Sequence, residues 1–164
     1  MPYHIRSATP DDLSTILPLF PRLASFELPA HRVATHLWEG DAELLRQWAN
    51  GQAPGCFVFI AVERGTNDAE HIDDEGGVLG VSMTTLREEL LSHEPSAHLE
   101  VLVVAQGAEG QGIGRALVAK AEEKARLQGA RSMTLHVFAQ NRNARHLYHK
   151  MGYDEELIRA IKHF

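Results

Sequence analysis

The most informative segment of this chain reads Glu109-Gly110-Gln111-Gly112-Ile113-Gly114-Arg115. The apolar run Val101-Leu102-Val103-Val104 precedes it and is typical of a strand covered on both faces. Apolar residues recur at every fourth position after it, which predicts a helix over residues 112–128. Glycines at such a junction permit positive φ and close approach of a ligand. Because a helix N-terminus offers free N–H groups and a partial positive charge, the segment predicts a pyrophosphate cradle.

Two common phosphate-binding patterns do not fit this segment. A P-loop ends in Gly-Lys-Ser/Thr, whereas Gly114 is followed by Arg115-Ala116. A dinucleotide fingerprint reads G-x-G-x-x-G, and its third glycine would fall on Arg115 or on Leu117. On these residues alone, an ordinary strand-to-helix turn stays open as an alternative.

Composition limits the classes of partner and compartment. The net charge of −6 argues against a nucleic-acid surface, which needs clustered Lys and Arg, and it suits a cationic amine. The single cysteine, Cys56, excludes an intramolecular disulfide and is interpreted as a small core residue. No apolar run approaches the ~20 residues of a membrane span, and the N-terminus lacks signal-peptide features. We expect a cytoplasmic protein with no membrane partner.

Residue spacing along the whole chain predicts one domain over residues 1–164. Strands are expected over residues 3–6, 57–62, 78–84, 98–104 and 133–138, with two more short strands in 153–164. Helices are expected to begin at Thr9-Pro10 and to span 41–50, 112–128 and 141–151, and Pro18 and Pro21 should limit or kink the first one. Residues 64–77 read as a hairpin loop, and the Asp73-Asp74-Glu75 run in it as a solvated tip. Strands followed by a β-α-β unit indicate a mixed α/β (α+β) fold.

Two linked segments resemble the GNAT superfamily of N-acetyltransferases. The glycine segment matches that family's Arg/Gln-x-x-Gly-x-Gly/Ala loop except at Glu109. Asn141-Arg142-Asn143-Ala144, then Tyr148, then Gly152-Tyr153, is similar to its Asn-x-x-Ala-x-x-x-Tyr-x-x-x-Gly-Phe pattern. The resemblance covers residues 97–154. It implies a central, mostly antiparallel sheet of about six to seven strands, splayed at the fourth strand and flanked by about four helices.

The resemblance also implies a reaction. Acetyl-CoA would be the co-substrate, no metal would take part, and a primary amine of a small molecule or peptide would attack directly. A homodimer can form in such proteins. A catalytically inactive CoA-binding sensor or interaction module of the same fold is the alternative, and a different nucleotide-binding protein using the same loop is a second one. The cofactor-binding residues implied are Leu102, Val103, Val104, Glu109, Gly110, Gln111, Gly112, Ile113, Gly114, Arg115, Asn141, Asn143 and Arg145.

Acyl transfer to an amine needs a proton acceptor and benefits from a donor to the leaving thiolate. By resemblance, Glu100 is the candidate base, directly or through water, and Tyr148 the candidate acid. An exposed strand Glu and a core Tyr are the plain structural alternatives. Because side chains two apart share a face of a strand, His98, Glu100 and Leu102 are expected to project together.

The departure at Glu109 requires an explanation, since a carboxylate near phosphates repels them. We expect Glu109 to point to solvent, with Arg115 or Arg145 providing the compensating charge. Asn141 suits both a pantetheine contact and a helix N-cap. His146 and His149 share a helix face and read as solvated rather than as zinc ligands. Residues 26–38 are expected to form part of the acceptor wall, and His136 is either a substrate contact or a structural residue.

Overall fold

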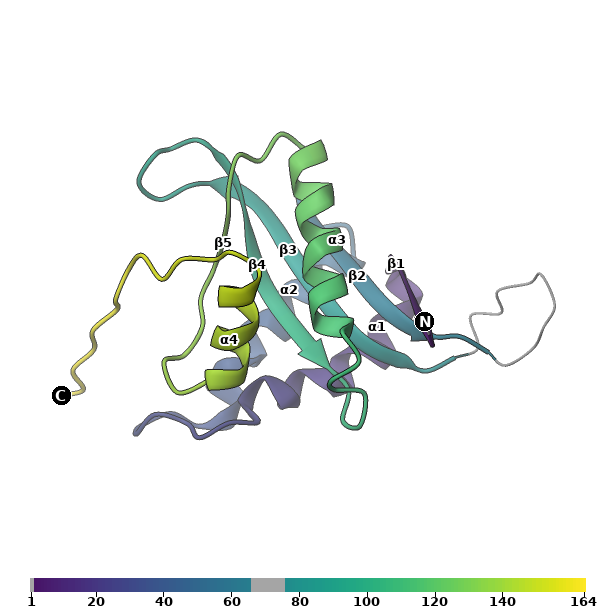
Figure 1. Cartoon of the computed structure of the whole chain (residues 1–164), viewed down its shortest axis with the longest axis horizontal. Helices are drawn as coiled ribbons and strands as arrows, with labels where there is room; N and C mark the ends of the chain where they lie inside the picture. The colour runs from purple at the N-terminus through teal and green to yellow at the C-terminus, as the bar shows by residue number, and fades with distance from the viewer. Residues whose placement is uncertain (1, 66–75) are drawn as a thin grey trace.

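One five-stranded sheet, in the order β1-β2-β3-β4-β5, runs through the computed structural model, which describes residues 2–65 and 76–164 (Figure 1). The first four strands pair antiparallel, and β5 pairs parallel to β4. The strands are β1 Tyr3–Ser7, β2 Cys56–Glu63, β3 Val78–Glu88, β4 Pro95–Val104 and β5 Met133–Leu135. The expected mixed α/β class with a mostly antiparallel sheet is confirmed.

Helices cover both faces of this sheet. The α-helices are α1 Leu13–Ile16, α2 Glu39–Ala49, α3 Ile113–Leu127 and α4 Arg142–Lys150, and the 3-10 helices are η1 Pro10–Asp12, η2 Leu17–Ala24 and η3 Ala34–Leu37. The expected first helix is interrupted where its prolines stand, since Pro18 is the second residue of the 3-10 segment η2 and Pro21 lies inside it. Proline removes a backbone donor and crowds the preceding turn, so a regular α-helix ends there.

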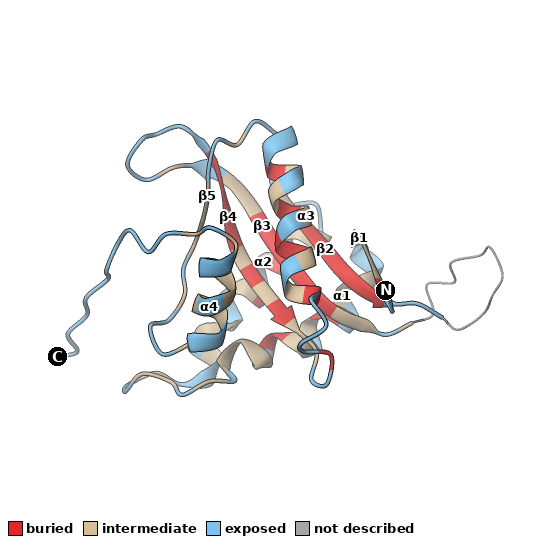
Figure 2. Ribbon diagram, in the orientation of Figure 1, coloured by how far each residue is buried: buried red, intermediate tan, exposed pale blue. Residues whose placement is uncertain are grey.

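Two apolar clusters hold the layers together, one on each side of the sheet. The buried positions lie mainly along the central strands and on parts of α3 (Figure 2). Ile16, Phe20 and Leu45 from the N-terminal helices pack on Val101 and Val103 of β4. On the opposite side, Ile113 and Leu117 of α3 pack with Tyr3, Phe59 and Ala61. Alternation along each strand therefore sends neighbouring residues into different clusters, as expected for a sheet covered on both faces.

The C-terminal segment differs from expectation. Five strands are found among the described residues where six to seven were expected, and residues 153–164 contain neither strand nor helix. Their large apolar residues Leu157, Ile158 and Ile161 do not alternate, so they offer no single face to a sheet. Ile158 is 98% exposed, and the segment leads away from the body of the protein (Figure 1). The strand expected over 133–138 is also shorter, ending at Leu135.

The Asp73-Asp74-Glu75 run lies outside the described residues. Within the described ranges, none of the helices is both long and apolar enough to traverse a bilayer.

Candidate active site

β4 separates from its neighbour halfway along its length. It pairs with β5 only at Ala97, His98 and Leu99, so in the described part of the chain the remaining edge, up to Val104, has no strand partner on that side. The register with β3 shifts at the same place: Val101 stands opposite Met83 and Leu99 opposite Thr84. Glu100 is therefore the extra residue of a β-bulge, a device that bends a strand and frees backbone groups. The expected splay at the fourth strand is confirmed.

The bulge also changes which side chains share a face. Leu102 belongs to the cluster under α3, whereas Glu100 lies against Thr85 and His98 on the side of α2. The expectation that His98, Glu100 and Leu102 project together is thus wrong for Leu102. Simple alternation fails here because an inserted residue shifts the period of two by one.

Glu100 is partly buried, with 16% of its side chain exposed. One carboxylate oxygen, Oε1, accepts a hydrogen bond from the Thr85 hydroxyl at 2.6 Å and another from the Arg87 guanidinium. The second oxygen, Oε2, lies 4.0 Å from Nε2 of His98. One oxygen is therefore held by partners, and the other faces the imidazole.

His98 is buried to 5% exposure beside this carboxylate. Its Nδ1 lies 2.7 Å from the Thr134 hydroxyl, and its ring meets that of His136 edge-on, with centroids 4.8 Å apart. Burial lowers the pKa of His98 to about 4, opposed by the nearby Glu100 charge. The imidazole is therefore neutral at pH 7.

Two further titratable groups of this region feel the Glu100 charge. Burial, with a smaller contribution from Glu100, raises the pKa of Asp41 at the start of α2 to about 7. The same two causes raise the pKa of Cys56 to about 11. The Cys56 thiol is therefore protonated at neutral pH, which agrees with its interpretation as a packing residue.

The glycine segment forms the junction between β4 and α3. Gly110 and Gly112 have φ of 76° and 79°, in the left-handed region that favours glycine, and Gly112 is the N-cap of α3. The first backbone bond of the helix runs from the Ala116 N–H to the Gly112 carbonyl, so the N–H groups of residues 112–115 precede it. A Cβ on Gly114 would lie 3.5 Å from Leu147 Cδ2, so α3 and α4 approach closely there. Ile113 is buried in the core, and Gln111 and Arg115 are exposed.

Glu109 is half exposed, at 52%, and its charge is balanced by a residue that the sequence did not suggest. One carboxylate oxygen accepts from the Arg22 guanidinium and the other from the Gly107 N–H at 2.6 Å. The expectation that Arg115 or Arg145 compensates is wrong: Arg145 instead binds Glu155, with Nε 2.6 Å from Oε1. Hydrogen bonds from its own N–H and that of Gly107 lower the pKa of Glu109, with the Arg22 charge contributing less.

A cavity of about 180 Å³ opens beside the unpaired edge of β4. Five residues implied by the resemblance to bind cofactor or adjoin it, Leu102, Val103, Val104, Glu109 and Asn141, line it together with Arg22, Leu23 and Ser25. Arg22 reaches into the region from η2 and donates from Nε to the Val104 carbonyl at 2.7 Å. The end of β4, the glycine junction and the start of α4 thus meet at one opening.

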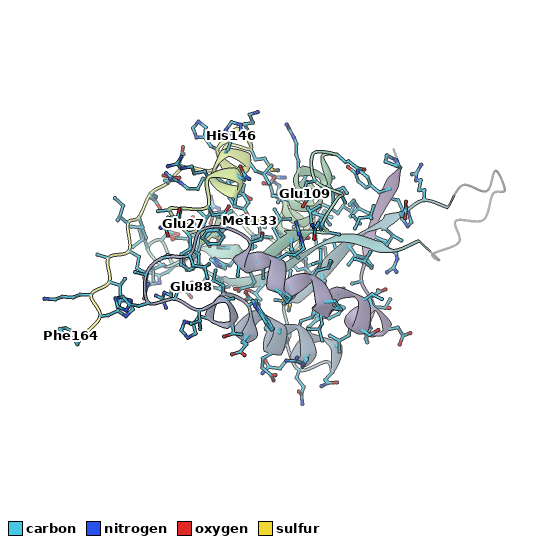
Figure 3. All side chains as sticks on the ribbon, turned by 90° about the horizontal axis from the view of Figure 1, so that it is seen from below. Glu27, Glu88, Glu109, Met133, His146 and Phe164 are labelled. Atoms are coloured by element: carbon cyan, nitrogen blue, oxygen red, sulfur yellow. The ribbon has the colours of Figure 1, made fainter. Side chains whose placement is uncertain are left out.

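Helix α4 begins at that opening. The Asn141 side chain caps it by accepting the Ala144 N–H at 3.2 Å. Tyr148 lies further along, where burial raises the pKa of its phenol to about 12, and its ring meets that of Tyr153 at 5.8 Å. Asn143 and His146 are exposed, and His146 points away from the sheet (Figure 3). No group of three His, Cys, Asp or Glu side chains suited to a metal is found in the part of the chain that is described.

The loop between η2 and η3 makes two ring contacts with the C-terminal part of the chain. Phe26 contacts Phe138, which follows β5, with ring centroids 5.6 Å apart. His31 contacts His163 of the C-terminal segment at 4.9 Å. Phe26 therefore lies next to the segment that follows β5, and the role of residues 26–38 as an acceptor wall stays a prediction.

Comparisons with known proteins agree with this geometry. The model of the family described as "Acetyltransferase (GNAT) family" matches residues 21–153. The chain is 28% identical to "Uncharacterized N-acetyltransferase YhfO" of Bacillus subtilis over 153 residues, which is 93% of this chain and 91% of that protein. A protein from Pyrococcus furiosus described as an acetyl transferase has a similar structure, with a TM-score of 0.74 and 22% identity over 99% of both chains. So does AAC(6')-Iy in complex with the bisubstrate analog CoA-S-monomethyl-acetylneamine, with a TM-score of 0.67 and 20% identity over 99% of both chains.

Proposed function

The chain belongs to the acetyltransferase (GNAT) family, and from this premise we propose that it transfers an acetyl group from acetyl-CoA to a primary amine. The observation that carries the proposal is the unpaired edge of β4, which leads directly into the glycine junction at the N-terminus of α3. An extended ligand with amides along its length and a pyrophosphate at its end suits such an arrangement.

The residues of this chain fit coenzyme A in two parts. The N–H groups of residues 112–115 and the positive end of α3 suit the pyrophosphate. The backbone of Leu102 and Val104, with the Asn141 side chain near them, suits the pantetheine arm. Acetyl-CoA supplies the activated acyl group as a thioester.

Glu100 suits the role of proton acceptor. Its Oε1 is fixed by Thr85 and Arg87, while Oε2 is free of a short hydrogen bond among the described residues. A primary amine with pKa near ~10 must lose a proton to attack, and Oε2 takes it directly or through one water. The neutral His98 beside it adds no positive charge that would repel a cationic amine.

Tyr148 suits the role of hydrogen-bond donor to the departing sulfur. Its pKa of about 12 keeps the phenol protonated at neutral pH. That pKa exceeds the ~8.5 of a free thiol, so complete transfer of the proton to the thiolate is uphill. We therefore assign Tyr148 to stabilisation of the thiolate through a hydrogen bond rather than to irreversible protonation.

The acceptor is best sought among small cationic amines. Glu100 and Asp41 place two carboxyl groups on the α2 side of the sheet, and Asp41, with a pKa of about 7, is partly ionised at neutral pH. The AAC(6')-Iy complex holds the bisubstrate analog CoA-S-monomethyl-acetylneamine, which supports a small-molecule acceptor by likeness of fold.

The test is release of free thiol from acetyl-CoA with a panel of primary amines, with the acetylated product detected by mass. We expect Glu100→Gln to lower kcat/KM by about 10²–10⁴-fold, as for loss of a general base. Tyr148→Phe should lower kcat by about 10²-fold, as for loss of a transition-state donor. Glu123→Gln, an exposed change on α3, is the matched control and should match wild type. Tight CoA binding without thiol release for any amine would instead indicate the inactive CoA-binding module.

A further inference from the structure

The acid at the first position of the glycine junction poses an electrostatic problem. Coenzyme A carries a pyrophosphate and a further phosphate, and a carboxylate within a few ångströms of them repels them. Glu109 lies on the cavity that the cofactor is proposed to enter, beside Val104 and Asn141. Some other group must offset this charge if the junction is to accept a phosphate.

We infer that Arg22 is the positioning residue that fits this junction for a pyrophosphate, by neutralising Glu109 and holding it back against its own loop. The inference rests on the proposed use of coenzyme A. The 3-10 segment η2 would then contribute to binding of the cofactor's phosphates through Arg22, in addition to packing on the sheet.

The contacts of Arg22 support this role. Its terminal nitrogen donates to one oxygen of Glu109, while the Gly107 N–H holds the other oxygen at 2.6 Å. The carboxylate is thus engaged on both sides and directed to the loop that precedes the helix. The Arg22 Nε is fixed in turn on the Val104 carbonyl at 2.7 Å. The guanidinium is therefore located by two acceptors from different parts of the site.

The same geometry offers one competing role. Because Arg22 occupies the Val104 carbonyl, it could act as a plug that coenzyme A must displace. The two roles predict opposite signs. Removal of a plug tightens binding, whereas removal of the neutralising cation leaves the Glu109 carboxylate bare beside the phosphates and weakens binding.

A double-mutant cycle on binding of CoA, measured by calorimetry at low salt, separates these roles. We expect Arg22→Ala to weaken binding about 10-fold. The double variant Arg22→Ala/Glu109→Gln should return to within about 3-fold of wild type, because the uncompensated charge is gone. Glu109→Gln alone should bind more tightly than wild type, since it leaves the Arg22 cation unpaired near the phosphates. Arg46→Ala, which removes an exposed Arg–Glu pair on α2, is the matched control and should bind like wild type.

Two readouts distinguish this role from loss of structure. The Arg22→Ala effect should shrink at high salt, because exposed charges are screened. Binding of pantetheine, which lacks the phosphates, should be equal in wild type and Arg22→Ala. Equal or tighter CoA binding by Arg22→Ala, or a double variant no better than Arg22→Ala, would overturn the inference. If wild type itself fails to bind CoA, the proposed function fails as well.

Discussion

Tyr3 offers a test of the packing beneath the glycine junction. Its side chain is 3% exposed and lies in the cluster under α3, yet no hydrogen-bond partner for its hydroxyl is found among the described residues. The hydroxyl lies next to Gly112, 3.8 Å from where a Cβ would stand. Tyr3→Phe removes this one oxygen and leaves the ring in place.

The expected effect is a gain in stability. A buried hydroxyl without a partner costs about 1–3 kcal/mol, and the small void left by its removal offsets part of that gain. We therefore expect the free energy of unfolding to rise by about 1 kcal/mol, with Tm higher by about 2–4 °C for a chain of this size.

Tyr153 provides the matched control, because its hydroxyl donates to Glu122 Oε1 at 2.8 Å. Tyr153→Phe should lower the free energy of unfolding by about 1 kcal/mol, since the carboxylate loses a partly buried donor. Urea unfolding of both variants at pH 7 measures the two effects. A loss of 1 kcal/mol or more in Tyr3→Phe would refute the reasoning, because it would show that the hydroxyl has a partner in solution.

Two further predictions concern titration and backbone geometry. Burial holds the pKa of His98 at about 4, below its unfolded value of 6.5. The contribution of His98 to the free energy of unfolding is therefore full above pH 6.5 and is lost as the pH falls toward 4. The pKa of Asp41 is raised to about 7, so its contribution is full at low pH and is lost as the pH rises through about 7. The two groups oppose each other between pH 4 and 7. On acidification from pH 7 to 4, the free energy of unfolding should therefore fall in Asp41→Asn and rise in His98→Asn. Urea unfolding at several pH values measures this, and the same pH dependence in both variants would contradict it. Gly112→Ala should lower the free energy of unfolding by about 1–2 kcal/mol, because its φ is 79°, and it should also weaken CoA binding. A Cβ on Gly114 would meet only ordinary contacts, so Gly114→Ala should lower Tm less than Gly112→Ala in a thermal melt.

Local chemistry made much of the fold predictable. Pro18 and Pro21 interrupt the first helix, and the glycines place the turn before α3 within a residue of its observed start. These features depend on φ limits and backbone donors that each residue carries by itself. The long apolar strands were predictable for a similar reason, since burial on both faces leaves a continuous apolar run.

The features that the sequence did not predict depend on distant partners. Arg22 and Glu109 are far apart in sequence, and neither residue type nor spacing links them. The partners of Glu100 follow from the register between β3 and β4, which the bulge shifts. The missing C-terminal strands have a related cause, because strand formation in residues 153–164 needs a neighbouring edge to pair with. The contact between Arg87 and Glu100 could have been predicted only if the pairing register of β3 and β4 had been known in advance.

The unpaired edge of β4 determines which mutations the site can absorb. A main-chain donor or acceptor is the same in almost every amino acid, so replacing Leu102 or Val104 alters packing with α3 and leaves the edge chemically unchanged. Proline is the exception, because it removes the N–H. A single inserted or deleted residue near Glu100 would exchange the two faces of the strand. The site is thus robust to drift in side-chain identity and fragile to changes in chain length, so new acceptor preferences can evolve on the surrounding helices and loops without disturbing this edge.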